Sequence, residues 1–198
     1  MKDAMMRHIM VIVAISGVLF TAQGNELRKE LSGFGRKVTC ASEEAQAWFD
    51  QGFTLYFSYH QDAAIPSFNK AYELDPTCTM ALWGTAITAG PHINNPAMDS
   101  VSARLAYETI QIATHSTEHL TAVEKDLIDA LTHRYSWPQA KDQMVSNLAY
   151  ANAMREVWKK HPNDVDVGVL FADAMMNLRP WDFWTFKNCG TQWPGLDV

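Results

Sequence analysis

Apolar and small residues recur at helical spacing between residues 45 and 78. Trp48, Gly52 and Leu55 mark a first stretch, and a second stretch closes before Asp75-Pro76. Intervals of three and four residues predict two helices, 43–58 and 62–74. Small residues let such helices approach closely, while large ones fill the space between them. We therefore expect a tightly packed antiparallel pair. The other members of this pattern are Ala64, Phe68 and Ala71.

The same kind of pattern continues through the rest of the chain. Ser42 is expected to cap the first helix, Asn95 to cap a later one that has Pro96 at its first position, and Thr121-x-x-Glu124 to form a capping box. The extra residues of the middle units make the array irregular. The further expected helices cover 79–89, 96–114, 121–135, 139–160 and 165–178.

The spacing of residues 45–78 fits the template of a tetratricopeptide repeat, W-x2-L-G-x2-Y followed by A, F, A and P, at seven positions. The stretch from Gly35 to Thr185 resembles a group of bacterial, often exported, tetratricopeptide-repeat proteins of unassigned biochemistry. Members of that group look considerably longer, so the chain resembles a truncated member. The segments that carry the resemblance are Ala45–Gly52, Ala81–Gly84, Gly90–Pro96 and Leu178–Asp182.

This resemblance implies an all-α fold, an α-solenoid of antiparallel helix pairs with irregular repeats. The helical domain is expected to cover residues 43–185. A lead-in segment, 25–42, precedes it because those residues are polar and lack periodicity. An irregular tail, 186–198, follows it.

The first 24 residues have the pattern of a signal peptide. Lys2 and Arg7 precede an apolar run from Ile9 to Phe20, and small residues then predict cleavage after Gly24. The run is shorter than the roughly 20 residues of a membrane-spanning helix, so no stable membrane insertion is expected. The sequence therefore predicts a periplasmic or secreted protein.

Charge excludes one class of partner. The chain has 16 basic and 22 acidic residues, and the part after Gly24 carries a formal charge of −7. A nucleic-acid-binding protein normally presents a basic surface, so no nucleic acid is expected as a partner.

Export gives the cysteines a structural role. Cys40 and Cys78 each precede the first helix of a repeat, and such helix starts lie side by side along a solenoid. We predict a Cys40–Cys78 disulfide, the alternative being two separate buried thiols. Cys189 remains, and no chemistry is assigned to it.

Repeat arrays of this kind usually bind peptides along the first helix of each repeat. The positions that would line such a groove are aromatic and apolar and lack the lysine and asparagine with which some relatives hold a terminal carboxylate. The alternative is that these side chains form the core. The predicted groove residues are Gln46, Phe49, Phe53 and Tyr56 of the first repeat and Met80, Trp83 and Ile87 of the second.

The histidines are the only residues that suggest a metal-binding or chemical function instead of peptide binding. His60 and His92 follow the first helices of adjacent repeats and could share a metal ion, although solvated histidines are commoner. His115 and His119 are four residues apart but lie across an expected helix break. No nucleophile or nucleotide-binding motif is present, so we expect no catalytic residue and no cofactor. The leading hypothesis is a scaffold for a protein or peptide partner. The alternative is a metal- or small-ligand-binding protein, possibly enzymatic, that is completed by further repeats.

Overall fold

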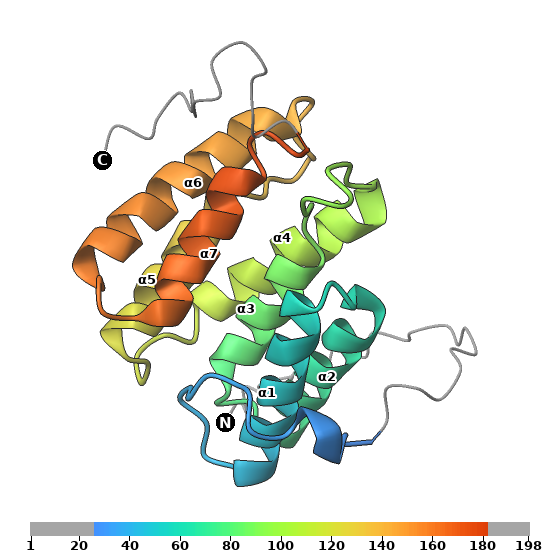
Figure 1. Cartoon of the computed structure of the whole chain (residues 1–198), viewed down its shortest axis with the longest axis vertical. Helices are drawn as coiled ribbons and strands as arrows, with labels where there is room; N and C mark the ends of the chain where they lie inside the picture. Colours follow the sequence, from blue (N-terminus) through green and yellow to red (C-terminus); the bar gives the residue numbers. More distant parts are fainter. Residues whose placement is uncertain (1–25, 182–198) are drawn as a thin grey trace, which may run out of the picture.

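A computed structural model describes residues 26–181, and this part of the chain is all-α (Figure 1). Apart from one isolated bridge between His92 and Asn95, the described residues contain no β-structure. The predicted signal peptide, Cys189 and the expected tail, 186–198, lie outside the described residues. The elements are a 3-10 helix, Lys29–Leu31, followed by α1 (Glu43–Phe57), α2 (Gln61–Leu74), α3 (Thr79–Thr88), α4 (Ser100–Thr114), α5 (Ala122–Thr132), α6 (Gln143–Lys160) and α7 (Val165–Met176).

Polar caps set most of the helix starts. The Ser42 hydroxyl accepts a hydrogen bond from Ala45 N, and Thr121 and Glu124 form the expected capping box. The expected start of α4 at Pro96 was wrong. Asn95 instead pairs with His92 in a turn, and the charged Asp99 carboxylate caps the helix. Likewise α6 begins at Gln143, after Asp142, and not at 139.

Close approach of α1, α2 and α3 depends on two glycines. A Cβ atom added at Gly52 or Gly84 would lie 2.8 or 2.5 Å from the Phe68 ring. The ring therefore fits between α1 and α3 only because both positions lack a side chain. Phe68 is fully buried there.

Consecutive helices pack against one another from α1 to α7, and α3 also contacts α1 and α5. The array returns on itself, because Tyr56 of α1 donates a hydrogen bond to Asp173 of α7 at 3.3 Å. Among the described residues, no helix is both long enough and apolar enough to cross a membrane.

Residues 36–42, here called the strap, run across the starts of several helices. The buried Arg36 guanidinium contacts Asp164 at 2.7 Å and Asp166 at 3.0 Å, at the start of α7. Thr39 donates from its backbone N and its hydroxyl to Glu124 of α5, at 2.6 and 2.7 Å. A segment expected to be a simple lead-in thus joins elements far apart in the sequence.

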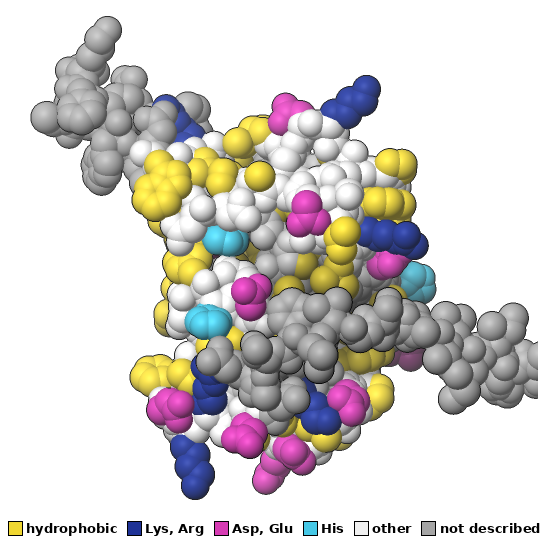
Figure 2. Space-filling model, turned by 90° about the vertical axis from the view of Figure 1, so that its right-hand side faces the viewer, with side chains coloured by type: hydrophobic (Ala, Val, Ile, Leu, Met, Phe, Trp, Pro, Cys, Tyr) yellow, Lys and Arg dark blue, Asp and Glu magenta, His cyan; other side chains and the backbone are white. Residues whose placement is uncertain are grey.

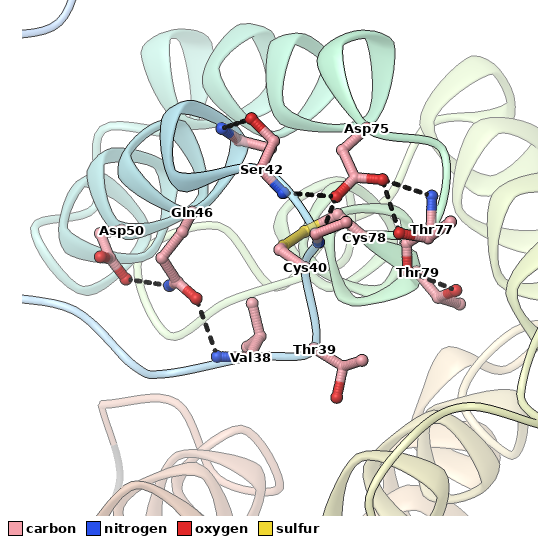
Figure 3. Close-up of a disulfide and its surroundings, with 12 residues drawn as sticks. Val38, Thr39, Cys40, Ser42, Gln46, Asp50, Asp75, Thr77, Cys78 and Thr79 are labelled. Carbon is pink, nitrogen blue, oxygen red and sulfur yellow. Dashed lines mark hydrogen bonds between the residues drawn. A yellow bond between two sulfur atoms is a disulfide. The ribbon is translucent and has the colours of Figure 1, made fainter.

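A disulfide fixes the strap to the start of α3. Cys40 and Cys78 are bonded, with an S–S distance of 2.03 Å (Figure 3). Beside it, one Asp75 oxygen accepts from Ala41 N and Ser42 N at 2.6 and 3.0 Å. Hydrogen bonds to Thr77 and to these backbone groups outweigh burial and lower the pKa of Asp75. The strap is therefore held by covalent, ionic and hydrogen bonds.

Candidate functional site

The predicted aromatic groove is part of the core, which corrects the sequence-based expectation. Phe49 and Trp83 are fully buried, and Phe53, Tyr56 and Ile87 are at most 7% exposed. Met80 is buried with them. Phe49 stacks on Phe53 and meets the edge of Phe68, with ring centroids 5.8 and 5.4 Å apart. These side chains are consequently not available to a peptide.

Gln46, the polar member of the predicted groove, holds the strap. Its side-chain nitrogen donates to Arg36 O and to an Asp50 carboxylate oxygen, each at 2.9 Å. Figure 3 shows the hydrogen bond to Asp50 and the one that the Gln46 oxygen accepts from Val38 N. The Gln46 side chain therefore makes three hydrogen bonds, all to other residues of this chain. Gln46 thus holds the strap against α1.

A group of polar side chains that the sequence analysis missed lies inside the array. This polar cluster consists of Tyr56, Arg134, Tyr135, Tyr150 and Asp173, which come from α1, α6, α7 and the segment after α5. Asp173 accepts from Tyr56 at 3.3 Å and from Asn177 at 3.1 Å. The signal available in the sequence was weak, because apart from the neighbours Arg134 and Tyr135 its members are 15 to 117 positions apart and belong to no motif.

Arg134 is a buried cation that donates hydrogen bonds to neutral groups. Its guanidinium donates to Pro91 O at 2.9 Å and to Asn147 at 3.4 Å. It also lies over the Tyr150 ring, 4.8 Å from the centroid. Such a cation–π contact stabilises a desolvated charge. Arg134 thereby joins the loop after α3 to α6.

Burial shifts the ionisation of the whole polar cluster. Loss of solvent raises the pKa of Tyr135 to about 12 and, more strongly, raises the pKa values of Tyr56 and Tyr150. Burial also raises the pKa of Asp173, although nearby Arg134 opposes this. At neutral pH the tyrosines are uncharged hydrogen-bond donors and acceptors.

Of the two loop histidines, His92 is half-buried and His60 is exposed, and a metal ion shared between them stays a prediction. The ring beside His92 belongs to Tyr59, with centroids 5.6 Å apart, and His60 next to it is exposed. Tyr59 has a φ of 56°, an unusual conformation for a residue with a side chain. Burial lowers the pKa of His92, so the ring is neutral at physiological pH.

The second histidine pair is used in backbone contacts. His115 Nδ1 lies 2.7 Å from Gln111 O, and His119 Nε2 lies 2.8 Å from Thr77 O. Over residues 26–181, no group of three or more His, Cys, Asp or Glu side chains could hold a metal ion.

Large apolar side chains nevertheless remain at the surface. Those on α4, on α6 and in the loop between α5 and α6 are called the exposed apolar set. Trp137 lies beside Arg104 of α4, and the Gln139 amide donates to Met98 O at 2.8 Å, so this loop connects the two helix starts. Figure 2 shows hydrophobic side chains reaching one face in several groups between acidic ones. The set comprises Val101, Leu105, Ile112, Trp137, Met144, Val145 and Leu148.

Comparison with protein-family models, with curated proteins and with solved structures finds no match to this chain. Functional inference therefore depends on the residues and their geometry.

Proposed function

We propose that the chain is an exported scaffold of the tetratricopeptide type that binds another protein through the exposed apolar set. One observation carries this proposal: Val145 is 66% exposed and Leu148 50% exposed, although the helices beneath them share a well-filled core. Exposed large apolar side chains that lie together are typical of interaction surfaces, and the loop containing Trp137 contacts both α4 and the segment before it. The succession of packed helices supports the repeat architecture.

The chemistry of the surface favours an amphipathic helix as the bound segment. Helical partners place apolar side chains at intervals of three and four residues, as Val101 and Leu105 do on α4 and Val145 and Leu148 do on α6. The chain has a formal charge of −6, which favours approach of a partner with basic flanking residues. The proposed partner is thus a protein with an apolar, basic-flanked helix.

Location outside the cytosol is part of the proposal. A disulfide between Cys40 and Cys78 fits an oxidising compartment, because cytosolic thiols are kept reduced. The N-terminal sequence pattern supports the same location.

Site-specific photo-crosslinking in the native cells tests the function. A diazirine amino acid at Val145 should form a discrete adduct with one protein, which mass spectrometry identifies. The matched control is the same amino acid at the exposed Glu73 of α2. Equal adducts from both positions, or none from Val145, would refute this surface.

Elemental analysis of the same purified protein tests the alternative hypothesis. A stoichiometric transition metal bound to the native protein would favour a metal-binding function. The scaffold proposal expects none.

A further inference from the structure

Residues 28–36 form an arch over α1 that is fixed at both ends. At one end Arg28 N donates to the Gln51 side-chain oxygen at 2.7 Å. At the other, Arg36 N donates to Asp50 at 3.1 Å. The backbone between these two points is therefore held near α1 without filling the space beneath it.

An apolar hollow of about 380 Å³ lies under the arch. This volume falls within the roughly 300–1,000 Å³ typical of small-ligand pockets. Its apolar lining comes from Leu27, Leu31, Phe34 and Ala47. A second hollow of about 300 Å³ adjoins it and shares Gly33, Phe34 and Asp50.

Two features of the arch leave room for a ligand beside Phe34. Phe34 is 68% exposed although it lines both hollows, so its ring has apolar space beside it that no described residue fills. Gly33, with a φ of 96°, has no atom within 4 Å of the position where a Cβ would lie. A large apolar side chain next to open apolar space gains stability when a ligand covers it.

The charges around the hollow favour an anionic head group. Lys29 lines the first hollow and Lys37 the second, and both are exposed. The single carboxylate of the lining, Asp50, is engaged through one oxygen by Gln46 and by Arg36 N. Exposed lysines attract an anion while its apolar body is buried.

We propose that the hollow under the arch binds an anionic amphiphile of the fatty-acid class, with its chain against Leu31 and Phe34 and its head group near Lys29 and Lys37. This site is separate from the exposed apolar set and does not depend on it. The bound chain would also shield Phe34 from water.

Calorimetric titration of the natively processed protein with decanoate, below its micelle concentration, tests the site. Saturable binding of one decanoate is expected. Replacing Ala47 by Phe should abolish it, because the new ring fills the hollow from the exposed side of α1. The double variant Lys29→Glu/Lys37→Glu should weaken decanoate binding at least tenfold, whereas Lys141→Glu, elsewhere on the surface, should leave it unchanged.

Decylamine provides the head-group control. The proposal expects decylamine to bind the wild type at least tenfold more weakly than decanoate does. In the double lysine variant, decylamine should bind at least as tightly as decanoate. Absence of saturable decanoate binding to the wild type would overturn the site. So would unchanged binding by the Ala47→Phe variant with an unaltered melting temperature, and tighter binding of the amine would overturn the assigned head group.

Discussion

Tyr135 illustrates how closely single residues are adjusted to one another in this core. Its buried hydroxyl has no hydrogen-bond partner among residues 26–181. If Gly90 carried a side chain, its Cβ atom would overlap the Tyr135 hydroxyl. The glycine is therefore needed for space, and the hydroxyl occupies the space that the glycine leaves.

Replacing Gly90 by Ala should destabilise the protein by about 1–3 kcal/mol, because the added methyl group overpacks this contact. Tyr135→Phe removes the overlapping oxygen, so the double variant should lose less stability than Gly90→Ala alone. Urea denaturation of the two single variants and the double variant measures the coupling. Additive effects would show that the two groups do not touch.

The buried tyrosines predict sensitivity to alkali. The pKa of Tyr135 is near 10.0 in the unfolded chain and raised to about 12 by burial, so over that range the unfolded state binds fewer protons. The stabilising contribution is complete below pH 10 and is lost as the pH rises toward 12. The urea midpoint should fall steadily over that range. In Tyr135→Phe the fall should be shallower, and an unchanged slope would contradict this assignment.

Among the elements, the strap is the one that links the starts of α3, α5 and α7. It bonds to the start of α7 through Arg36, to α5 through Thr39 and to α3 through Cys40. Because these contacts join residues as far as 130 positions apart, they hold together ends of the chain that short loops do not connect.

Removing the disulfide with Cys40→Ser should lower stability only under oxidising conditions. The bonded residues are 38 positions apart, for which chain entropy predicts about 4 kcal/mol. Thermal melting with and without reductant measures the difference. Identical melting of variant and wild type in both conditions would show that the bond is absent in the protein.

Arg36 makes a separate contribution that depends on pH. Its guanidinium lowers the pKa of Asp164, so the stability from this pair is present at neutral pH and is lost as the pH falls through the lowered value, below 3.8. Arg36→Gln should cost about 3 kcal/mol at pH 7, since it leaves two acidic groups without their cation. The loss should shrink toward pH 3. A constant difference across that range, measured by urea denaturation, would argue against the ion pair.

At the scale of the whole molecule, local signals in the sequence predicted the helices better than their surfaces. The Ser42 and Thr121 caps and the small residue Gly52 each act through neighbours within a few positions or through one close contact, so spacing reveals them. However, apolar residues at helical spacing look the same in the sequence whether that face of the helix is buried in the core or binds a partner. The aromatic stripe containing Phe53 was consequently open to both interpretations.

The strap and the polar cluster were beyond the reach of such signals. Arg36 and Asp164, or Tyr56 and Asp173, meet only because the array returns on itself, and no local pattern encodes that return. Cys40 and Cys78 were an exception, since export and matching positions before two helices gave a reason to pair them. The solenoid form itself stays a prediction.

The most direct test of the account compares two double variants, once the crosslinked partner is known. Phe53→Ala/Tyr56→Ala should lower stability by at least 3 kcal/mol, because it removes two buried rings. Val145→Glu/Leu148→Glu should leave the melting temperature within a few degrees of the wild type and abolish partner binding. Loss of partner binding by the first variant with unchanged melting, and retained binding by the second, would contradict the account and restore the aromatic groove.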